Sequence, residues 1–329
     1  MLWINFNYNM EFAIVTVLLF ISILVYFKIA DQYNIIDKPN HRSAHTQITL
    51  RGGGIIFPIA FIIFCLFHLQ DAVNQYWSFG LGLLAICSIS FVDDVRNLSN
   101  KIRLSIHFVS VILLLYFTGA FNIMPFWVWP ILFILIIGTL NAYNFMDGIN
   151  GMTGLYSLVA LCSLNYINRE VVQFADNSFI YYPTLASLVF LFFNFRKKAK
   201  CFAGDVGSMG IGFWVIALIT LLIIKTGDYK YIFLLSIYGM EVVLTIIERI
   251  LLKENIFEAH RRHLYQLFAN EKKVSHLVIS FVYAFVQLII NIFLIYSQLP
   301  IWAVILIIFV PVGGLYLGLK WSLKKQYNL

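Results

Sequence analysis

Charged residues are scarce in this chain. They make up 12% of its 329 residues, whereas ordinary soluble domains carry roughly 25%. Cysteine is also scarce: Cys65, Cys87 and Cys162 lie in apolar runs, and Cys201 has no CxxC partner. These shortages argue against a soluble domain, a disulfide framework and a zinc site. Hydrophobic residues, in contrast, reach 61%, so the chain belongs in lipid.

Apolar runs of about 17 to 21 residues recur along the chain, and each can cross a hydrocarbon core about 30 Å thick as a helix. We therefore predict an all-α polytopic membrane protein, with residues 1–329 forming a single integral membrane domain. The eleven predicted spans are residues 11–30, 53–69, 77–92, 104–120, 126–142, 153–167, 178–194, 207–224, 229–247, 277–297 and 300–319.

The basic residues predict the orientation, because Lys and Arg accumulate in short cytoplasmic loops. All but three of the 23 lie on one side of the predicted spans, the exceptions being Arg169, Lys225 and Lys230. The N-terminus is therefore expected outside and the C-terminus in the cytoplasm. The net charge of +7 is then a topology signal that suits anionic membrane lipid, and it does not call for nucleic acid as a partner.

Ionisable residues avoid the middle of the predicted spans, where a transporter would be expected to place them. Glu241 is the main exception, and a structural role is about as plausible there as a functional one. The inner loops instead carry five clusters of carboxylates, amides, glycines and histidines: Asp37–Gly54, Asp93–Arg103, Asn141–Gly154, Cys201–Gly212 and His260–Gln266. This asymmetry predicts a site at the cytoplasmic membrane surface.

Adjacent carboxylates end the third predicted span. Helical spacing places Asp93, Asn97 and Lys101 on one stripe, and Asp94 lies beside Asp93. Two carboxylates at a membrane edge become favourable beside a divalent cation or a cationic partner, or when one of them takes a proton. The alternative interpretation is an ordinary solvated helix end.

The most informative segment is Asn141–Gly154, which combines Asn141, Asn144, Asp147 and Asn150 with three glycines. Carbonyl and carboxylate oxygens suit Mg²⁺, which typically shares phosphate oxygens of a substrate, and glycine allows a backbone to approach a phosphate closely. A plain turn between helices would need no function.

Two further clusters suit anions. Gly204 and Asp205 precede the eighth predicted span, where unpaired N–H groups at a helix N-terminus attract negative charge; a simple helix cap is the alternative. His260 and His263 would face the same way on a helix, with Arg261 among the donors that match a pyrophosphate. The alternative here is a basic amphipathic segment lying on anionic lipid.

Arg51 is followed by three glycines, Gly52 to Gly54, before the second predicted span. These glycines permit close approach either to an anion or to another helix. The sequence leaves both roles open.

Taken in order, the five clusters resemble those of the polyprenyl-phosphate N-acetylhexosamine-1-phosphate transferase family, and the resemblance covers nearly the whole chain. The run Asn-x-x-Asn-Phe-Met-Asp-Gly-Ile-Asn-Gly-Met at 141–152 is highly specific. Phe-x-Gly-Asp-x-Gly-Ser at 202–208 and the Asp93–Asp94 pair, with Lys101 downstream, add strong support.

The resemblance implies that Asn144 and Asp205 hold Mg²⁺, or Mn²⁺, against the pyrophosphate of a UDP-sugar. It further implies that Asn150 lies by the uridine. Asp93 and Asp94 would serve near the acceptor phosphate. The remaining predicted residues are Asp147, Lys101, His260 and His263 for catalysis, and Asn97, Asn141, Arg261, Arg51 and Gly204 for substrate binding.

Two departures from the family pattern matter. The frequent His-x-His-His reads His260-Arg261-Arg262-His263, and the usual Pro before Arg51 is Leu50. The first makes the chain look nearest to the O-antigen- and capsule-initiating branch typified by WbpL, whose donors include 6-deoxy N-acetylated sugars. The second implies only a locally altered loop.

The predicted reaction moves N-acetylhexosamine 1-phosphate from a UDP-activated N-acetylated amino sugar to undecaprenyl phosphate, releasing UMP. It would be the first step of a cell-surface glycan pathway, on the cytoplasmic face of the bacterial inner membrane. Asp93 or Asp94 would act as a base or only position the acceptor. A transporter or flippase of lipid-linked sugar and a non-catalytic lipid-binding scaffold are the competing hypotheses. Enzymes that this chain resembles form dimers, and the sequence leaves open whether this chain forms a homodimer.

Overall fold

The structure, a computed structural model, describes residues 2–37, 48–96, 98–256, 258 and 260–327. Among these residues it is a bundle of helices with one small antiparallel sheet, in which β1 (Ile36–Asp37) pairs with β2 (Thr49–Leu50). The helices are α1 (Leu2–Gln32), α2 (Ile56–Phe67), α3 (Leu69–Asn74), α4 (Trp77–Val95), α5 (Asn100–Thr118), α6 (Ala120–Ile123), α7 (Trp129–Met146), α8 (Met152–Tyr166), α9 (Asn177–Asn194), α10 (Gly204–Thr226), α11 (Ser236–Leu251), α12 (Leu264–Asn270), α13 (His276–Tyr296) and α14 (Ile301–Tyr327).

Shorter helical turns complete the chain, namely η1 (Gly53–Ile55), η2 (Phe126–Val128), the π-helical turn η3 (Ile167–Val171) and η4 (Tyr229–Leu235). The predicted all-α membrane class is confirmed, and each of the eleven predicted ranges is helical over most of its length. Eight of the described helices are long and apolar enough to cross a membrane. Three that cover other predicted ranges, α2, α8 and α9, fall outside this group, so the number of crossings stays a prediction.

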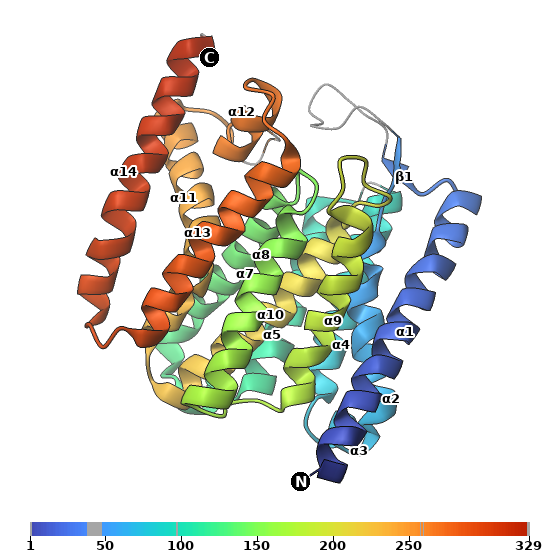
Figure 1. The fold of residues 1–329 in the computed structure, drawn as a ribbon. Helices are drawn as coiled ribbons and strands as arrows, with labels where there is room; N and C mark the ends of the chain where they lie inside the picture. Colours follow the sequence, from blue (N-terminus) through green and yellow to red (C-terminus); the bar gives the residue numbers. More distant parts are fainter. Residues whose placement is uncertain (1, 38–47, 97, 257, 259, 328–329) are drawn as a thin grey trace.

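Helix α10 lies at the centre of the bundle (Figure 1). In its most apolar stretch, 78% of the residues are buried, against 22% for α1 and 17% for α14. Glycines make this central place possible, because a Cβ at Gly210 would lie 2.9 Å from the Cys87 sulfur and one at Gly212 would lie 3.0 Å from the Tyr143 ring. Small residues allow such close packing of helices in lipid, where hydrophobicity alone does not drive association.

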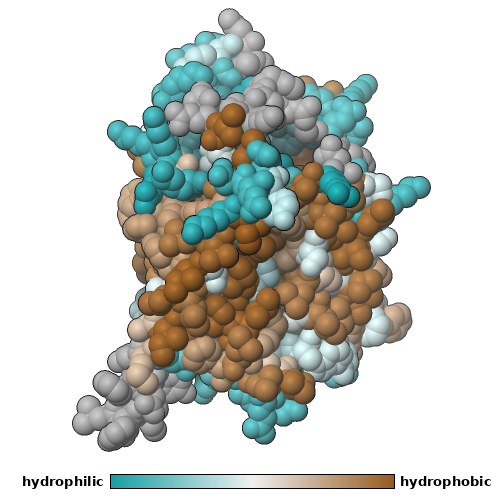
Figure 2. All heavy atoms as spheres, turned by 90° about the vertical axis from the view of Figure 1, so that its right-hand side faces the viewer, coloured by the Kyte–Doolittle hydropathy of each residue, from teal (hydrophilic) through white to brown (hydrophobic). Residues whose placement is uncertain are grey.

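A broad apolar band crosses the middle of the molecule, with hydrophilic residues gathered above and below it (Figure 2). Peripheral helices supply much of the exposed apolar surface, as Val17 on α1 and Val310 on α14 illustrate. Such a band would promote aggregation of a protein in water but matches the hydrocarbon core of a bilayer.

The polar clusters gather at one end of the bundle. β1, α12 and the connections that follow α7 and α9 lie together at the top of Figure 1. The described chain begins at the bottom of that view and ends at the top, as an odd number of crossings requires.

Candidate active site

Three carboxylates and two arginines meet where α4 ends, and we call this group the carboxylate–arginine cluster: Arg51, Asp93, Asp94, Arg103 and Asp205. Arg51 Nη2 lies 2.8 Å from Asp94 Oδ1 and 3.6 Å from Asp205 Oδ1. Arg103 Nη1 lies 2.8 Å from Asp93 Oδ2, and its Nη2 lies 3.5 Å from Asp205 Oδ2. The Asp205 carboxylate therefore lies between two guanidinium groups.

Asp94 caps the N-terminus of α10. Its side chain is fully buried, and its carboxylate accepts hydrogen bonds from the backbone N–H groups of Asp205 (3.0 Å) and Val206 (3.2 Å). The amides expected to attract a substrate anion are thus occupied by a carboxylate of the protein itself. Gly204, predicted to bind substrate, makes room for this contact: its φ is +71°, and a Cβ there would lie 2.6 Å from Asp94 Oδ2.

The glycines after Arg51 pack against α10. The N–H groups of Gly53 and Gly54 donate to the carbonyls of Phe202 (2.8 Å) and Ala203 (3.0 Å). A Cβ at Gly54 would collide with the backbone of Gly207. Of the two roles left open by the sequence, the described contacts are those of close packing, and this packing carries Arg51 to the carboxylates.

Arg103 was not among the predicted site residues. It faces the carboxylate–arginine cluster from the first turns of α5, whereas Lys101, two residues earlier, is exposed. Residues two apart on a helix point to different sides, so only one of the two can face the carboxylates. The signal is present in the sequence, since Arg103 belongs to the cluster Asp93–Arg103, but of its last two cations only Lys101 is assigned to the site and Arg103 is used for topology alone. Asn97, predicted to bind substrate, lies outside the described residues.

The end of α7 joins the carboxylate–arginine cluster through the first turn of α10. Asn144 Nδ2 donates to Ser208 Oγ (3.3 Å), and this hydroxyl in turn lies 3.2 Å from the Gly204 carbonyl oxygen. The structure therefore brings Asn144 to the helical turn that carries Asp205. Asn141 is half-buried one turn earlier on α7.

Asp147 ends α7 and accepts a hydrogen bond from Thr153 Oγ1 at 2.6 Å. Burial raises the pKa of the Asp147 carboxyl to about 7; the Thr153 hydrogen bond and Arg51 oppose the rise, while Asp205 and Asp94 add to it. The carboxyl thus exchanges its proton near neutral pH and lies within electrostatic range of the carboxylate–arginine cluster.

Asn150 is buried, and its side-chain amide donates to the Arg196 carbonyl at 2.8 Å. Its backbone carbonyl accepts a hydrogen bond from Ser280 (2.8 Å). Its Oδ1 has no hydrogen-bond partner among the residues that the structure describes. A buried acceptor without a hydrogen-bond partner lowers stability unless a ligand or a water molecule donates to it.

His260 and His263 belong to a stretch that we call the histidine segment, residues 260–263 with α12. The expectation that these two histidines share a helix was wrong, because α12 begins only at Leu264. Their rings nevertheless lie 4.8 Å apart. Burial and the charges of nearby residues lower the pKa of His260 to about 4, and its Nδ1 accepts the N–H of Arg262 at 3.3 Å. His260 is therefore neutral at pH 7.

The histidine segment contacts the end of α7 directly. Tyr265 Oη donates to the Phe145 carbonyl at 2.8 Å, and the rings of His263 and Phe145 lie 6.3 Å apart. Gly148 admits Tyr265, since a Cβ at Gly148 would collide with the Tyr265 hydroxyl. The carboxylate–arginine cluster, the end of α7 and the histidine segment thus form one connected region.

The two arginines between the histidines differ in their surroundings. Arg262 Nε donates to Glu254 Oε2 at 3.0 Å, and its Nη1 lies 3.7 Å from Glu248. Arg262 is therefore engaged within the protein. Arg261 is half-buried, and its predicted contact with substrate stays a prediction.

Comparison with known proteins agrees with this geometry. The model of glycosyl transferase family 4 matches residues 76–224, a range that contains Asp93, Asp94, Asn144 and Asp205. This match spans 149 of the 329 residues and supports the resemblance that the sequence motifs carry.

Three curated proteins similar to this chain are informative. The chain is 28% identical over 325 residues to a probable undecaprenyl-phosphate N-acetylglucosaminyl 1-phosphate transferase of Bacillus subtilis (strain 168), covering 91% of this chain and 87% of the relative. It is 24% identical over 248 residues to an undecaprenyl-phosphate alpha-N-acetylglucosaminyl 1-phosphate transferase of Thermotoga maritima, covering 74% and 75%. An enzyme of the same name from Salmonella typhi is 26% identical over 229 residues, covering 63% of this chain and 60% of the relative.

The donor set at this end of the bundle suits a hard divalent cation. Within the described part of the chain, no group of three or more His, Cys, Asp or Glu side chains is placed to hold a metal. Asp205 and Asn144 offer carboxylate and amide oxygens, and Asp205 is 19% exposed. Mg²⁺ commonly takes one or two carboxylates and fills its remaining positions with water and substrate phosphate, so these residues fit it.

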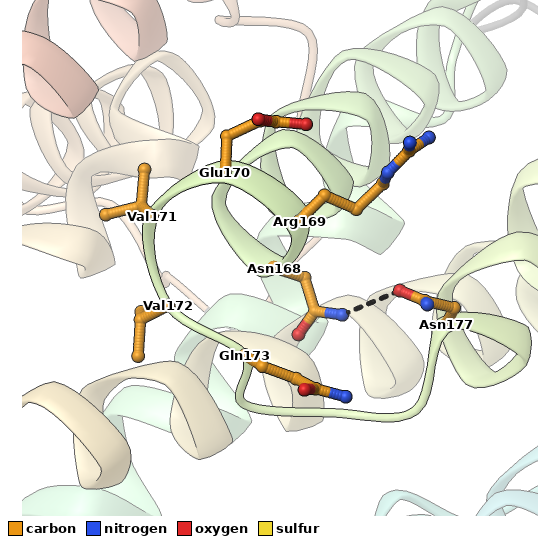
Figure 3. Close-up of a pocket in the computed structure, with 7 residues that line it drawn as sticks. All are labelled: Asn168, Arg169, Glu170, Val171, Val172, Gln173 and Asn177. Atoms are coloured by element: carbon orange, nitrogen blue, oxygen red, sulfur yellow. Dashed lines mark hydrogen bonds between the residues drawn. The ribbon is translucent and has the colours of Figure 1, made fainter.

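A separate hollow of about 360 Å³ lies between α8 and α9, at the other end of the bundle (Figure 3). Asn168 organises it by bonding to Asn177 at 3.0 Å, along the dashed line in Figure 3, and by accepting the N–H groups of Phe174 and Ala175. These bonds satisfy polar groups of the loop that joins α8 to α9. The predicted site residues lie elsewhere.

Proposed function

We propose that this chain transfers N-acetylhexosamine 1-phosphate from a UDP-activated N-acetylated amino sugar to undecaprenyl phosphate, releasing UMP. The observation that carries the proposal is the contact, at one end of an apolar bundle, between the carboxylate–arginine cluster, the end of α7 and the histidine segment. A site at the end of a membrane bundle admits a lipid phosphate from the bilayer and a nucleotide sugar from water. The names of the relatives support the same reaction.

The central difficulty of this reaction is electrostatic, because a lipid phosphate oxygen attacks the β-phosphorus of a negatively charged donor. Asp205 and Asn144 would hold Mg²⁺, or Mn²⁺, which neutralises pyrophosphate charge and favours departure of UMP. Arg51 and Arg103 lie 3.6 Å and 3.5 Å from Asp205, close enough to offset charge on phosphate oxygens beside it. Positioning and electrostatics of this kind supply most of the catalysis in phosphoryl transfer.

The adjacent carboxylates have different tasks in this proposal. Asp94 holds the start of α10, where its bonds to Arg51 and to the N–H groups of Asp205 and Val206 occupy it. Asp93 is 12% exposed and is oriented by Arg103 and by the Leu98 N–H (2.9 Å), so it is the carboxylate beside the acceptor phosphate. A phosphate whose second pKa is about 6 scarcely needs a base, and Asp93 accordingly positions the acceptor.

In this proposal Asp147 and His260 act as hydrogen-bond donors that carry little or no charge near pH 7. A half-protonated Asp147 and a neutral His260 can donate hydrogen bonds to phosphate or sugar oxygens without adding negative charge to an already anionic site. His263 would lie on the sugar side of the same region. The attack on phosphorus leaves the anomeric carbon untouched, so the anomeric configuration is retained.

We also propose where in the cell this protein acts. The site faces the cytoplasm at the bacterial inner membrane, where the predicted basic loops lie, and the reaction begins a cell-surface glycan. The Arg-rich form of the histidine segment favours a donor of the kind used by the O-antigen- and capsule-initiating branch.

The test is UMP release by detergent-purified protein given undecaprenyl phosphate, Mg²⁺ and a panel of UDP-GlcNAc, UDP-GalNAc and 6-deoxy N-acetylated UDP-sugars. Asp205→Asn and Asn144→Ala should each abolish release while the protein stays folded, and EDTA should abolish it until Mg²⁺ or Mn²⁺ is restored. Asp228→Asn is the matched control, because Asp228 pairs with Lys230 (3.1 Å) in η4, away from the site. No release with any donor, or full release by both site variants, would refute the proposal.

A further inference from the structure

Glu241 is a buried carboxylate inside the helical stretch Tyr229–Leu251, which is long enough to cross a membrane. It lies on α11 and is 1% exposed. A carboxylate in such a place is costly and persists only with partners. Glu241 has them: Oε1 accepts the N–H of Leu264 at 2.5 Å and Tyr316 Oη at 3.2 Å, and Oε2 accepts Tyr283 Oη at 2.6 Å.

These partners come from three other helices. Leu264 begins α12, Tyr283 lies on α13 and Tyr316 lies on α14. The Leu264 bond carries the most consequence, because it attaches the histidine segment to the bundle at the residue after His263. Glu241 is therefore the point to which the start of α12 is tied.

His263 lies beside the same carboxylate. Its Nδ1 lies 3.5 Å from Glu241 Oε1, and the side chain is 3% exposed. Neither ring nitrogen has a hydrogen-bond partner within the described part of the chain. The His263 ring also stacks near Tyr265, with centroids 5.8 Å apart. The ring is thus enclosed beside the Glu241 carboxylate, and the bond from the Leu264 N–H to Glu241 holds the backbone next to it.

The Glu241 carboxylate is itself held in place by a network of side chains on α11 and α14. Tyr316 Oη lies 3.0 Å from Thr245 Oγ1, one turn further along α11, and Lys320 Nζ lies 3.1 Å from Tyr316 Oη. These contacts tie the outermost helix, α14, to α11. The acceptor position of Glu241 is therefore fixed by a buried network rather than by one bond.

We propose that Glu241 is a positioning residue for the donor half of the site, holding the start of α12 and the His263 ring in register with the end of α7. This rests on the proposed function, because the donor half is defined by that reaction. Glu241 touches neither substrate in this proposal. It acts through Leu264 and His263.

The kinetic test compares Glu241→Gln, Glu241→Leu and Glu11→Gln by UMP release. Glu11 is the matched control, since it accepts Tyr182 Oη at 2.9 Å and lies 3.1 Å from His68 but is remote from the site. Leucine fills a similar volume without an acceptor, so kcat/KM for the UDP-sugar should fall about 100-fold, with KM for undecaprenyl phosphate changed less than about twofold. Glutamine keeps an acceptor oxygen and should restore activity to within about tenfold of wild type.

A second readout does not depend on the reaction. Trypsin cuts after Lys253, Arg261 and Arg262, which lie on the stretch that Glu241 ties down. Cleavage there should be at least several-fold faster in Glu241→Leu than in wild type, and unchanged in Glu11→Gln. Should Glu241→Leu fail to fold, the double variant Tyr283→Phe/Tyr316→Phe replaces it in both assays.

The outcomes separate the two proposals. A wild-type protein that releases no UMP from any donor refutes the proposed function, while the cleavage comparison still tests the attachment of α12. Equal cleavage in wild type and Glu241→Leu overturns the attachment. A uniform loss of active enzyme, without a selective change in kcat/KM for the UDP-sugar, overturns the positioning role.

Discussion

The carboxylate–arginine cluster and the histidine segment lie in one connected region but are held together by different forces. In the first, opposite charges from four segments contact one another, and Asp94 is fully buried beside Arg51 at 2.8 Å. In the second, N–H and hydroxyl groups converge on the single carboxylate of Glu241. Removing one charge of a buried pair leaves the other uncompensated, whereas a hydrogen-bonded acceptor tolerates a neutral replacement. The first region should therefore be the more sensitive to substitution.

The largest effect is expected at Asp94. Asp94→Ala leaves two N–H groups of α10 without their acceptor and leaves Arg51 with only the more distant Asp205 carboxylate, which should cost about 2–4 kcal/mol of stability together with all activity. Asp94→Asn keeps an acceptor oxygen and should lose less. Thermal unfolding in detergent measures both, and an alanine variant that melts at the wild-type temperature would contradict the buried-charge account.

Arg103 and Lys101 give a paired comparison within one helix. Arg103→Met should lower kcat/KM about 100-fold, the effect of removing one preorganised charge contact, because Arg103 lies at Asp93 and Asp205. Lys101→Met should lower it less than about threefold, since Lys101 is exposed. UMP release by the two variants measures the difference, and a larger loss in Lys101→Met would show that the lysine has the role the family resemblance implies.

The sequence predicted the first region better than the second, for physical reasons. Asp93, Asp94 and Asp205 carry their chemistry visibly in short motifs, and hydrophobic runs located the helices that present them. Whether Lys101 or Arg103 faces these carboxylates depends on how α5 is rotated about its axis. The two residues are only two positions apart, so a small error in the predicted rotation selects the wrong one. The sequence identifies the histidine segment but not its attachment to the bundle, because Glu241 lies inside an apolar helix 19 residues before His260, where nothing local distinguishes a support from a ligand.

Asp147 lies between the two regions and gives a pH dependence. Because its pKa is raised from 3.8 to about 7, the folded protein binds this proton more tightly than the unfolded chain does. Stability from this group is present below pH 4 and is lost as pH rises to about 7. Asp147→Asn keeps the oxygen that accepts the Thr153 hydrogen bond and removes the titration. The variant should therefore gain about 5 °C in Tm relative to wild type between pH 4 and pH 8; a constant difference would show that the carboxyl titrates normally.

The smallest effect tests whether the two regions work as one site. Tyr265→Phe removes only the bond to the Phe145 carbonyl, 2.8 Å long, and should cost about 1 kcal/mol with a loss of kcat/KM below about fivefold. Tyr166→Phe is the matched control, because the Tyr166 hydroxyl bonds to that of Tyr296 away from the site, and it should change neither quantity. The Tyr265 loss should appear in KM for the UDP-sugar and spare KM for undecaprenyl phosphate, since Asp93 and Arg103 keep their contacts. A loss shared equally by both substrates would mean that the histidine segment supports the whole site, and the division between the two regions would fail.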